Sequence, residues 1–197
     1  MRVLAVAVLS AGVAGMGGNP LHYPQPSNQP DEFFVLVEIP ESGAVKYEVD
    51  VETGDLLVDR FLAMPMAYPA NYGSITSSLQ QDGDPLDALV ITRTPLHPGV
   101  LVRVRALGVL RMIDNDEADD KIITVPASAV DATFDAVQAL EDLPEMDRKR
   151  LRAFFETYNL FSDAEVVISG FQDAKVARRL VSEAVARFEA KKKPPAH

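Results

Sequence analysis

Three aspartates lie close together within residues 82–87 of this chain, which read DGDPLD. The glycine and proline of this segment favour a stiff, irregular turn, and its leucine offers an apolar anchor to a core. A second acidic run, DNDEADD at residues 114–120, ends at Lys121. Crowded carboxylates repel one another, and oxygen ligands in a chain without cysteine favour Mg²⁺ or Mn²⁺ over zinc. The two runs therefore predict a site for a hard divalent cation.

Each acidic run has another interpretation. An isolated run of this kind is often an ordinary solvated loop or hairpin tip. An EF-hand calcium loop that begins at Asp82 is excluded, because such a loop needs glycine at its sixth position and glutamate at its twelfth. The chain has Asp87 and Arg93 at these positions. The choice between a solvated loop and a metal site depends on what precedes the two runs.

Residues suited to binding phosphate precede the acidic runs. Lys46 and Glu48 alternate with apolar residues in 44–50, so a strand there would place both side chains on one face. Arg60 offers a planar guanidinium that can bind two phosphate oxygens at once. Residues 67–73 add two tyrosines and an asparagine, on what their proline and glycine predict to be a loop. A cation and a carboxylate on one strand face suit a site that holds both an anion and metal ions.

The order of these motifs resembles that of the soluble family I inorganic pyrophosphatases of the bacterial type. Members carry the signature D-[SGDN]-D-[PE]-[LIVMF]-D-[LIVMGAC], and residues 82–88 satisfy every position of it. The resemblance extends from about residue 32 to the region of residue 171 and includes segments 37–40, 46–48, 58–61, 68–73, 108–112 and 114–121. It implies hydrolysis of inorganic pyrophosphate to two phosphates through a metal-activated water, with Mg²⁺ as the cofactor and Mn²⁺ as the alternative ion.

The resemblance also implies roles for individual side chains. Asp84 would orient the attacking water or accept its proton. The first activating metal would be held by Asp82, Asp87 and Asp119, with Asp87 bridging to a second metal. Metals that arrive with the substrate would be held by Asp114, Asp119 and Glu48. The phosphates would be bound by Lys46, Arg60, Tyr72, Lys121 and Tyr158. Outer residues that fix the geometry of the site would be Glu38, Tyr68 and Asn71.

The chain departs from the family pattern after Tyr158. Members of the family have a phosphate-binding lysine at the next position, where this chain has Asn159, and residues 160–165 contain no basic residue. Losing one charge-assisted hydrogen bond would weaken phosphate binding by about 1.5 to 3 kcal/mol. Because the catalytic aspartates are retained, we expect an active enzyme. The alternative is a catalytically weakened pyrophosphatase-like protein that binds phosphate or metal.

Composition limits the partners of the chain. With 197 residues, of which 47% are hydrophobic, it is long enough for one domain with a sizeable core. A net charge of −10 argues against a nucleic-acid partner, whose phosphates need lysine and arginine. An OB-like oligonucleotide-binding module is disfavoured for the same reason. The expected partners are pyrophosphate and further copies of the chain, since the resemblance to bacterial members implies a homohexamer.

The pattern of apolar residues predicts strands followed by helices, and hence an α+β fold. Helices are expected at about 144–158 and 173–192, because apolar residues recur there at helical spacing. The resemblance narrows this to an OB-like five-stranded β-barrel flanked by helices. The strands are expected at 33–39, 44–50, 56–61, 88–92, 100–113 and 121–125.

The N-terminal segment differs from the rest. Residues 1–15 have a basic start, a short apolar run and small residues at their end, which predicts a signal peptide rather than a membrane span. The mature protein would then be periplasmic or secreted, with no membrane attachment. If translation starts at Met16, the protein would be cytoplasmic. Residues 16–31 are expected to form an irregular arm, and residues 32–197 a single pyrophosphatase domain.

Overall fold

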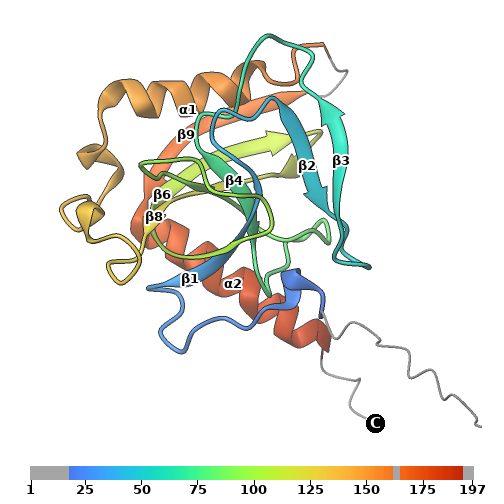
Figure 1. Ribbon diagram of the computed structural model, residues 1–197, viewed down its shortest axis with the longest axis vertical. Helices are drawn as coiled ribbons and strands as arrows, with labels where there is room; N and C mark the ends of the chain where they lie inside the picture. Colours follow the sequence, from blue (N-terminus) through green and yellow to red (C-terminus); the bar gives the residue numbers. More distant parts are fainter. Residues whose placement is uncertain (1–17, 162–164, 193–197) are drawn as a thin grey trace, which may run out of the picture.

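The computed structural model describes residues 18–161 and 165–192, and it has the predicted α+β architecture, with a strongly curved sheet and two long helices (Figure 1). The predicted signal peptide and Met16 lie outside the described residues. Residues 18–31 are irregular apart from the short 3₁₀ helix η1 (Pro20–His22). No helix of the described segments combines the length and the apolar character that crossing a bilayer requires.

Five strands close into the predicted barrel. Neighbouring strands pair in the order β1-β4-β5-β8-β6, and β1 also pairs with β6, which closes the ring. Strands β5 and β8 run parallel, whereas the other neighbours in the ring run antiparallel. The strand bounds are β1 (Phe33–Ile39), β4 (Asn71–Ile75), β5 (Asp87–Val90), β6 (Leu101–Asp114) and β8 (Lys121–Pro126).

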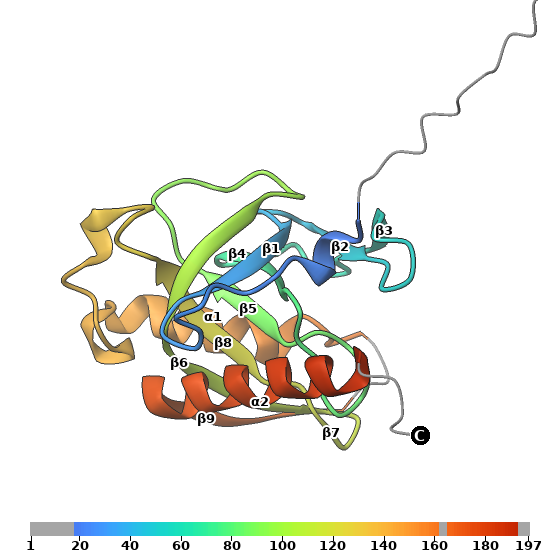
Figure 2. The same cartoon turned by 90° about the horizontal axis from the view of Figure 1, so that it is seen from below.

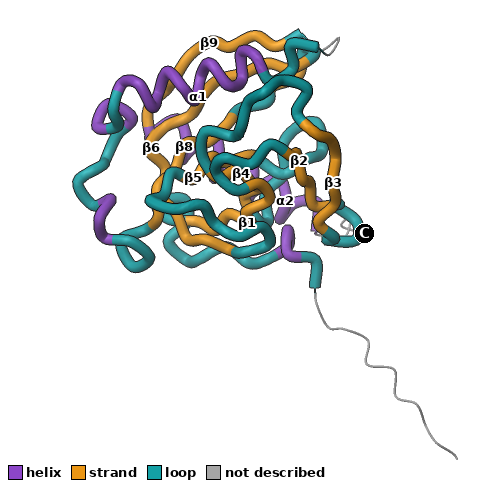
Figure 3. Tube along the Cα trace, turned by 45° about the horizontal axis from the view of Figure 1, so that its top comes forward, coloured by secondary structure: helices purple, strands orange, loops and turns teal. Residues whose placement is uncertain are grey.

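Within residues 18–161 and 165–192, four further strands lie outside this ring. Strands β2 (Val45–Val49) and β3 (Leu56–Phe61) form a separate two-stranded sheet, which projects beside the barrel in Figure 3. Strands β7 (Glu117–Ala118) and β9 (Val166–Asp173) both pair with the long strand β6. The strands predicted near 44–50 and 56–61 are thus confirmed, and they build a hairpin rather than the barrel.

The loop predicted over residues 67–73 is confirmed for residues 67–70 and wrong from Asn71, where the barrel strand β4 begins. All of its residues are buried, so no alternation of apolar and polar residues reveals it in the sequence. Gly73 allows β4 to approach β1, since a Cβ atom there would lie 1.9 Å from the carbonyl oxygen of Leu36. Packing between the strands therefore overrides the turn-forming tendency of this segment.

In the described part of the chain two α-helices flank the barrel, and the 3₁₀ turns η2 (Ala132–Phe134) and η3 (Leu140–Asp142) precede the first of them. Helix α1 (Glu145–Thr157) buries Leu151, Phe154 and Phe155, which belong to the predicted apolar stripe. Helix α2 (Ala174–Lys192) lies along β6 and β9, as Figure 2 shows. It buries Ala177, Val181, Ala184 and Phe188.

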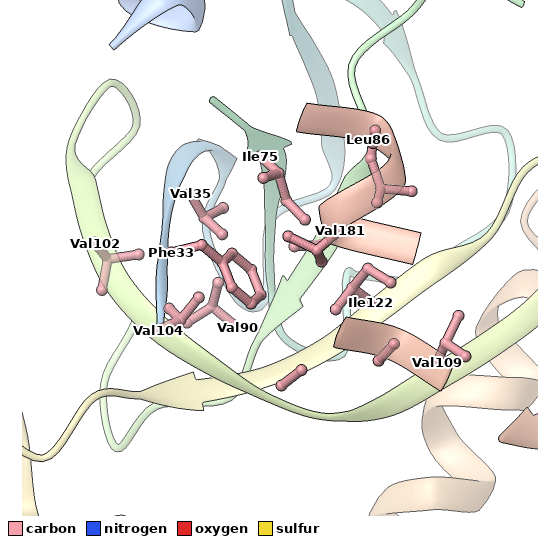
Figure 4. Close-up of a cluster of buried hydrophobic side chains, with 14 of the residues drawn as sticks. Phe33, Val35, Ile75, Leu86, Val90, Val102, Val104, Val109, Ile122 and Val181 are labelled. Carbon is pink, nitrogen blue, oxygen red and sulfur yellow. The ribbon is translucent and has the colours of Figure 1, made fainter. Parts of the chain in front are cut away.

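The core joins the barrel interior to α2 (Figure 4). Phe33, Val35 and Ile122 are fully buried inside the barrel, and Val181 reaches them from α2. Leu86 belongs to the same cluster and is 2% exposed. The acidic turn at residues 82–87 is therefore anchored through its leucine, as predicted.

Candidate active site

A cavity of about 330 Å³ collects the predicted site residues. Its walls come from the hairpin β2–β3, the turn at residues 82–87, the turn that follows β6, and the end of α1. All predicted site residues except Asn71 line it: Glu38, Lys46, Glu48, Arg60, Tyr68, Tyr72, Asp82, Asp84, Asp87, Asp114, Asp119, Lys121 and Tyr158. The fold thus brings together both acidic runs and the cations that precede and follow them in the sequence.

Hydrogen bonds hold the acidic turn that carries Asp84. The backbone N–H of Asp84 donates to Asp82 Oδ1 at 3.0 Å, and Gly83 adopts a φ of +103°, which favours glycine. Partial loss of solvent, followed by the charges of Asp82 and Glu48, raises the pKa of Asp84. Its carboxylate is therefore more basic than an ordinary aspartate and suited to accept a proton.

Four residues of the cavity lining, Lys121, Asp87, Asp119 and Tyr72, are joined by hydrogen bonds and form what is called the floor of the cavity. The Lys121 ammonium donates to Asp87 Oδ2 at 2.6 Å and also to Asp119, while the Tyr72 hydroxyl donates to the same Asp87 oxygen at 2.6 Å. Burial alone would lower the pKa of Lys121, but the charges of Asp87 and Asp119 outweigh it and raise the pKa. Burial raises the pKa of Tyr72 well above its ordinary value, so the phenol stays a donor. The floor is a charged network with a fixed arrangement.

The predicted metal ligands share this cavity, but within the described residues no three of them converge closely enough to form a ready-made metal cluster. The ammonium of Lys121 balances Asp87 and Asp119 instead. The residues nevertheless suit a hard cation. All of the predicted donors are carboxylate oxygens, and Asp114 Oδ1 is buried without a hydrogen-bond partner among the described atoms. Burial also raises the pKa of Asp119, an effect that a nearby cation would oppose.

Cations on the hairpin β2–β3 face the acidic floor. Lys46 Nζ lies 3.0 Å from both Glu48 Oε2 and Asp59 Oδ2, and Arg60 Nη1 lies 2.8 Å from the same Asp59 oxygen. Arg60 Nη2 donates to Asn159 Oδ1 at 3.2 Å, which connects the hairpin to the end of α1. Sequence reasoning missed Asp59 as a site residue. Asp59 lies between the two cations because the strand register places Lys46 opposite Arg60, the residue next to Asp59.

Glu38 lies beneath the hairpin and is 4% exposed. Its Oε1 atom accepts hydrogen bonds from the Val49 N–H at 3.1 Å and from the Ser74 hydroxyl at 3.2 Å. Burial, followed by the charge of Asp87, raises the pKa of Glu38 to about 8. Glu38 therefore connects the hairpin to β4. Ser74, like Asp59, is a residue of the site region that the sequence did not reveal.

Two predicted residues at the edge of the site differ in position. Tyr158 follows α1 and its hydroxyl lies 3.4 Å from Asp114 Oδ2, while burial raises its pKa to about 12. Asn71 does not line the cavity. Its amide donates to the Val90 carbonyl at 3.0 Å and to Thr92 Oγ1 at 2.8 Å. The structure therefore places Asn71 among backbone contacts of the barrel rather than beside the cavity.

Fold and site together define a class of protein. A closed barrel presents carboxylates suited to divalent cations on one side of a cavity, and lysine, arginine and tyrosine donors around it. Phosphoryl transfer needs this combination, because it relies on positioning and on neutralising phosphate charge. The class is that of metal-dependent hydrolases acting on phosphate compounds.

The chain belongs to the inorganic pyrophosphatase family. The family model described as "Inorganic pyrophosphatase" matches residues 35–189, which extends past the predicted limit near residue 171 into α2. The inorganic pyrophosphatase of Agrobacterium fabrum is 43% identical over 164 residues, covering 82% of this chain and 93% of that protein. That of Rickettsia prowazekii is 46% identical over 159 residues, covering 80% and 92%.

Solved structures agree with this assignment. The inorganic pyrophosphatase of Thermus thermophilus superposes with a TM-score of 0.83 at 36% identity, covering 87% of this chain and 99% of that one. The enzyme of Coxiella burnetii gives a TM-score of 0.78 at 41% identity, covering 81% and 96%. The aligned region covers nearly all of each solved chain and more than four fifths of this one.

Proposed function

We propose that this protein is an inorganic diphosphatase that hydrolyses pyrophosphate to two phosphates with Mg²⁺ as its cofactor and Mn²⁺ as the alternative ion. The observation that carries the proposal is the convergence of both acidic runs and five phosphate-type donors on one cavity. The donors are Lys46, Arg60, Tyr72, Lys121 and Tyr158. Family membership supports the substrate and the need for a divalent cation.

The carboxylates divide the work of the reaction. Divalent ions, when bound, lower the pKa of a water and neutralise charge on the phosphates. The residues that would hold them are Asp82, Asp87, Asp114, Asp119 and Glu48. Asp84 would accept a hydrogen bond from the attacking water and then take its proton, a role that its raised pKa favours.

The cations bind the substrate from two sides of the cavity. Lys46 and Arg60 would bind phosphate oxygens from the hairpin, while Lys121, Tyr72 and Tyr158 would bind them from the barrel and α1. Asp59 orients the two hairpin cations, since it contacts both of them. Glu38 and Tyr68 would fix the geometry around these groups, since Glu38 bonds to the hairpin backbone and Tyr68 packs against Tyr72 and Phe154.

A turnover measurement separates this enzyme from a protein that only binds pyrophosphate. We would mix the purified chain with a thousandfold excess of pyrophosphate and Mg²⁺ and measure phosphate over time. An enzyme releases two phosphates for every pyrophosphate consumed and continues far beyond one equivalent per chain. Saturable binding of pyrophosphate without release of phosphate would establish the binding-only alternative.

We predict that Asn159→Lys tightens phosphate binding. A lysine there would add a cation next to Tyr158 and close to Arg60, which Asn159 already contacts. Because this contact would exist in both the ground state and the transition state, KM should fall by about tenfold while kcat changes little. Product phosphate should also inhibit more strongly. Asn159→Gln is the matched control, because it lengthens the side chain without adding charge.

The Asn159 variants allow a clear decision. Steady-state kinetics with added phosphate would give KM, kcat and the inhibition constant for all three proteins. Equal values for the lysine and glutamine variants would mean that a charge at position 159 does not reach the phosphate.

We further propose that the chain assembles as a homohexamer, on the strength of its similarity to bacterial members of the family. Sedimentation equilibrium of the purified protein would give the number of copies.

We also propose that residues 32–197 form the single pyrophosphatase domain.

We propose that residues 1–15 act as a signal peptide, which directs export of the protein and is then removed. Expressed from Met1 in a Gram-negative host, the protein should be found in the periplasm without these residues, because they have the composition of a signal peptide. The same gene started at Met16 should give cytoplasmic protein and serves as the control. Intact-mass analysis of each fraction checks this, and soluble cytoplasmic protein that retains Met1 and the following residues would contradict export.

A further inference from the structure

Helix α2 holds the segment that leads into the acidic turn. Arg187 Nε donates to the carbonyl oxygen of Leu79 at 2.8 Å in a partly buried contact. The N–H of Leu79 donates to the carbonyl oxygen of Ala184 at 3.0 Å. Both backbone polar groups of Leu79 are therefore bonded to α2, although the two segments are 108 residues apart in sequence.

Ser78 and Gln80, the neighbours of Leu79, form hydrogen bonds to the acidic turn at residues 82–87. The N–H of Gln80 donates to the carbonyl oxygen of Asp84 at 2.7 Å, and its side-chain amide donates to the Pro85 carbonyl at 3.3 Å. On the other side of Leu79, the Ser78 hydroxyl accepts the N–H of Leu86 at 2.9 Å. A short path of hydrogen bonds thus leads from Arg187 through Leu79 and Gln80 to Asp84.

We propose that Arg187 is a positioning residue for the acidic turn: by holding Leu79 it keeps Asp82 and Asp84 at the places where divalent ions and water would be bound. This inference rests on the proposed function, because it concerns the same carboxylates. A guanidinium is a charged donor, so its bond to a partly shielded carbonyl is stronger than a bond between neutral groups. Arg187 does not line the cavity, and its side chain reaches the acidic turn through the hydrogen bond to Leu79.

The helix itself does not depend on this contact. Its packing against the barrel comes from Ala177, Val181 and Ala184, all fully buried. Removing the Arg187 side chain should therefore leave α2 in place and loosen the turn. Because residues behind a metal ligand typically change metal affinity by about 10- to 100-fold, we expect Arg187→Ala to weaken divalent-ion binding by roughly tenfold.

The experiment compares Arg187→Ala with Arg179→Ala in the full chain. Arg179 lies on the same helix and pairs with Glu183 at 3.1 Å, so its removal also takes a guanidinium from α2 but leaves Leu79 untouched. Binding of Mn²⁺ would be measured directly by electron paramagnetic resonance, together with the Mg²⁺ dependence of pyrophosphate hydrolysis and the melting temperature. We expect weaker Mn²⁺ binding and a higher Mg²⁺ requirement for Arg187→Ala, and wild-type values for Arg179→Ala.

Two further variants keep the test decisive. Arg187→Lys retains a charged donor and should restore part of the Mn²⁺ affinity, whereas Arg187→Gln retains only a neutral one and serves if the alanine variant does not fold. A folded Arg187→Ala or Arg187→Gln with wild-type Mn²⁺ affinity would overturn the proposal, even if its melting temperature is lower. Failure of the wild-type protein to hydrolyse pyrophosphate would refute the proposed function but leave the Mn²⁺ comparison valid.

Discussion

Replacing Asp82, Asp87 or Asp119 by alanine is expected to remove nearly all pyrophosphate hydrolysis, at least about 100-fold in kcat/KM. Each change deletes carboxylate oxygens that would hold an activating metal ion, and the lowered pKa of the attacking water depends on that ion. The variants would be compared by phosphate release at saturating Mg²⁺. Asp82 is exposed and forms no ion pair among the described residues, although its Oδ1 accepts the Asp84 N–H, so the turnover of Asp82→Ala is read together with its melting temperature.

The other two changes also affect stability. Lys121 is 3% exposed and pairs with both Asp87 and Asp119, so removing either partner leaves its charge less well balanced. Melting temperatures must therefore accompany the kinetics. Asp116→Asn is the matched control, since Asp116 belongs to the same acidic run but is exposed and does not line the cavity, and asparagine tolerates its φ of +67°. A variant of Asp82 with wild-type turnover would refute its assignment as a metal ligand.

Asp84→Asn is expected to lower kcat by roughly 10² to 10⁴, the usual size of general acid–base catalysis. Asparagine keeps the shape of the side chain but cannot accept the proton of the attacking water. Divalent-ion binding, measured by calorimetry, should change much less than kcat. If the affinity for the ion fell by the same factor as turnover, Asp84 would be a metal ligand rather than the proton acceptor.

The sequence predicted the acidic turn well because its determinants are local. Gly83 takes a positive φ and Leu86 is buried, both as predicted, and both lie with the proline within residues 82–87. The apolar face of each helix was also predictable from helical spacing alone. Phe154 lies on the buried face of α1, and Ala177 lies on that of α2.

Features that depend on packing between distant segments could not be predicted. Strand β4 is buried on both faces, and Gly73 serves a close approach to β1 rather than a turn. Asp59 and Ser74 gain their roles from strand pairing, which places them next to Lys46 and Glu38. The resemblance implies that Asn71 is an outer residue of the site; it does not line the cavity, and its amide donates to the Val90 carbonyl and to Thr92 Oγ1.

The role of Lys121 also depends on packing that could not be predicted from the sequence. From sequence it is a lysine after an acidic run, and the resemblance implies a phosphate ligand. The structure shows in addition that it balances Asp87 and Asp119 across two strands. A single residue can therefore organise the carboxylates and also present a cation to the substrate, which position in the sequence alone does not reveal.

The central claim is that carboxylates in this cavity hold divalent ions that enable pyrophosphate hydrolysis. It is tested most directly by phosphate release from pyrophosphate during a Mg²⁺ titration of purified, chelator-treated wild-type protein. We predict no release in excess EDTA, a saturable rise in rate as Mg²⁺ is added, and a second loss when EDTA is restored. Undiminished turnover in EDTA, or no turnover at any Mg²⁺ or Mn²⁺ concentration, would contradict the account.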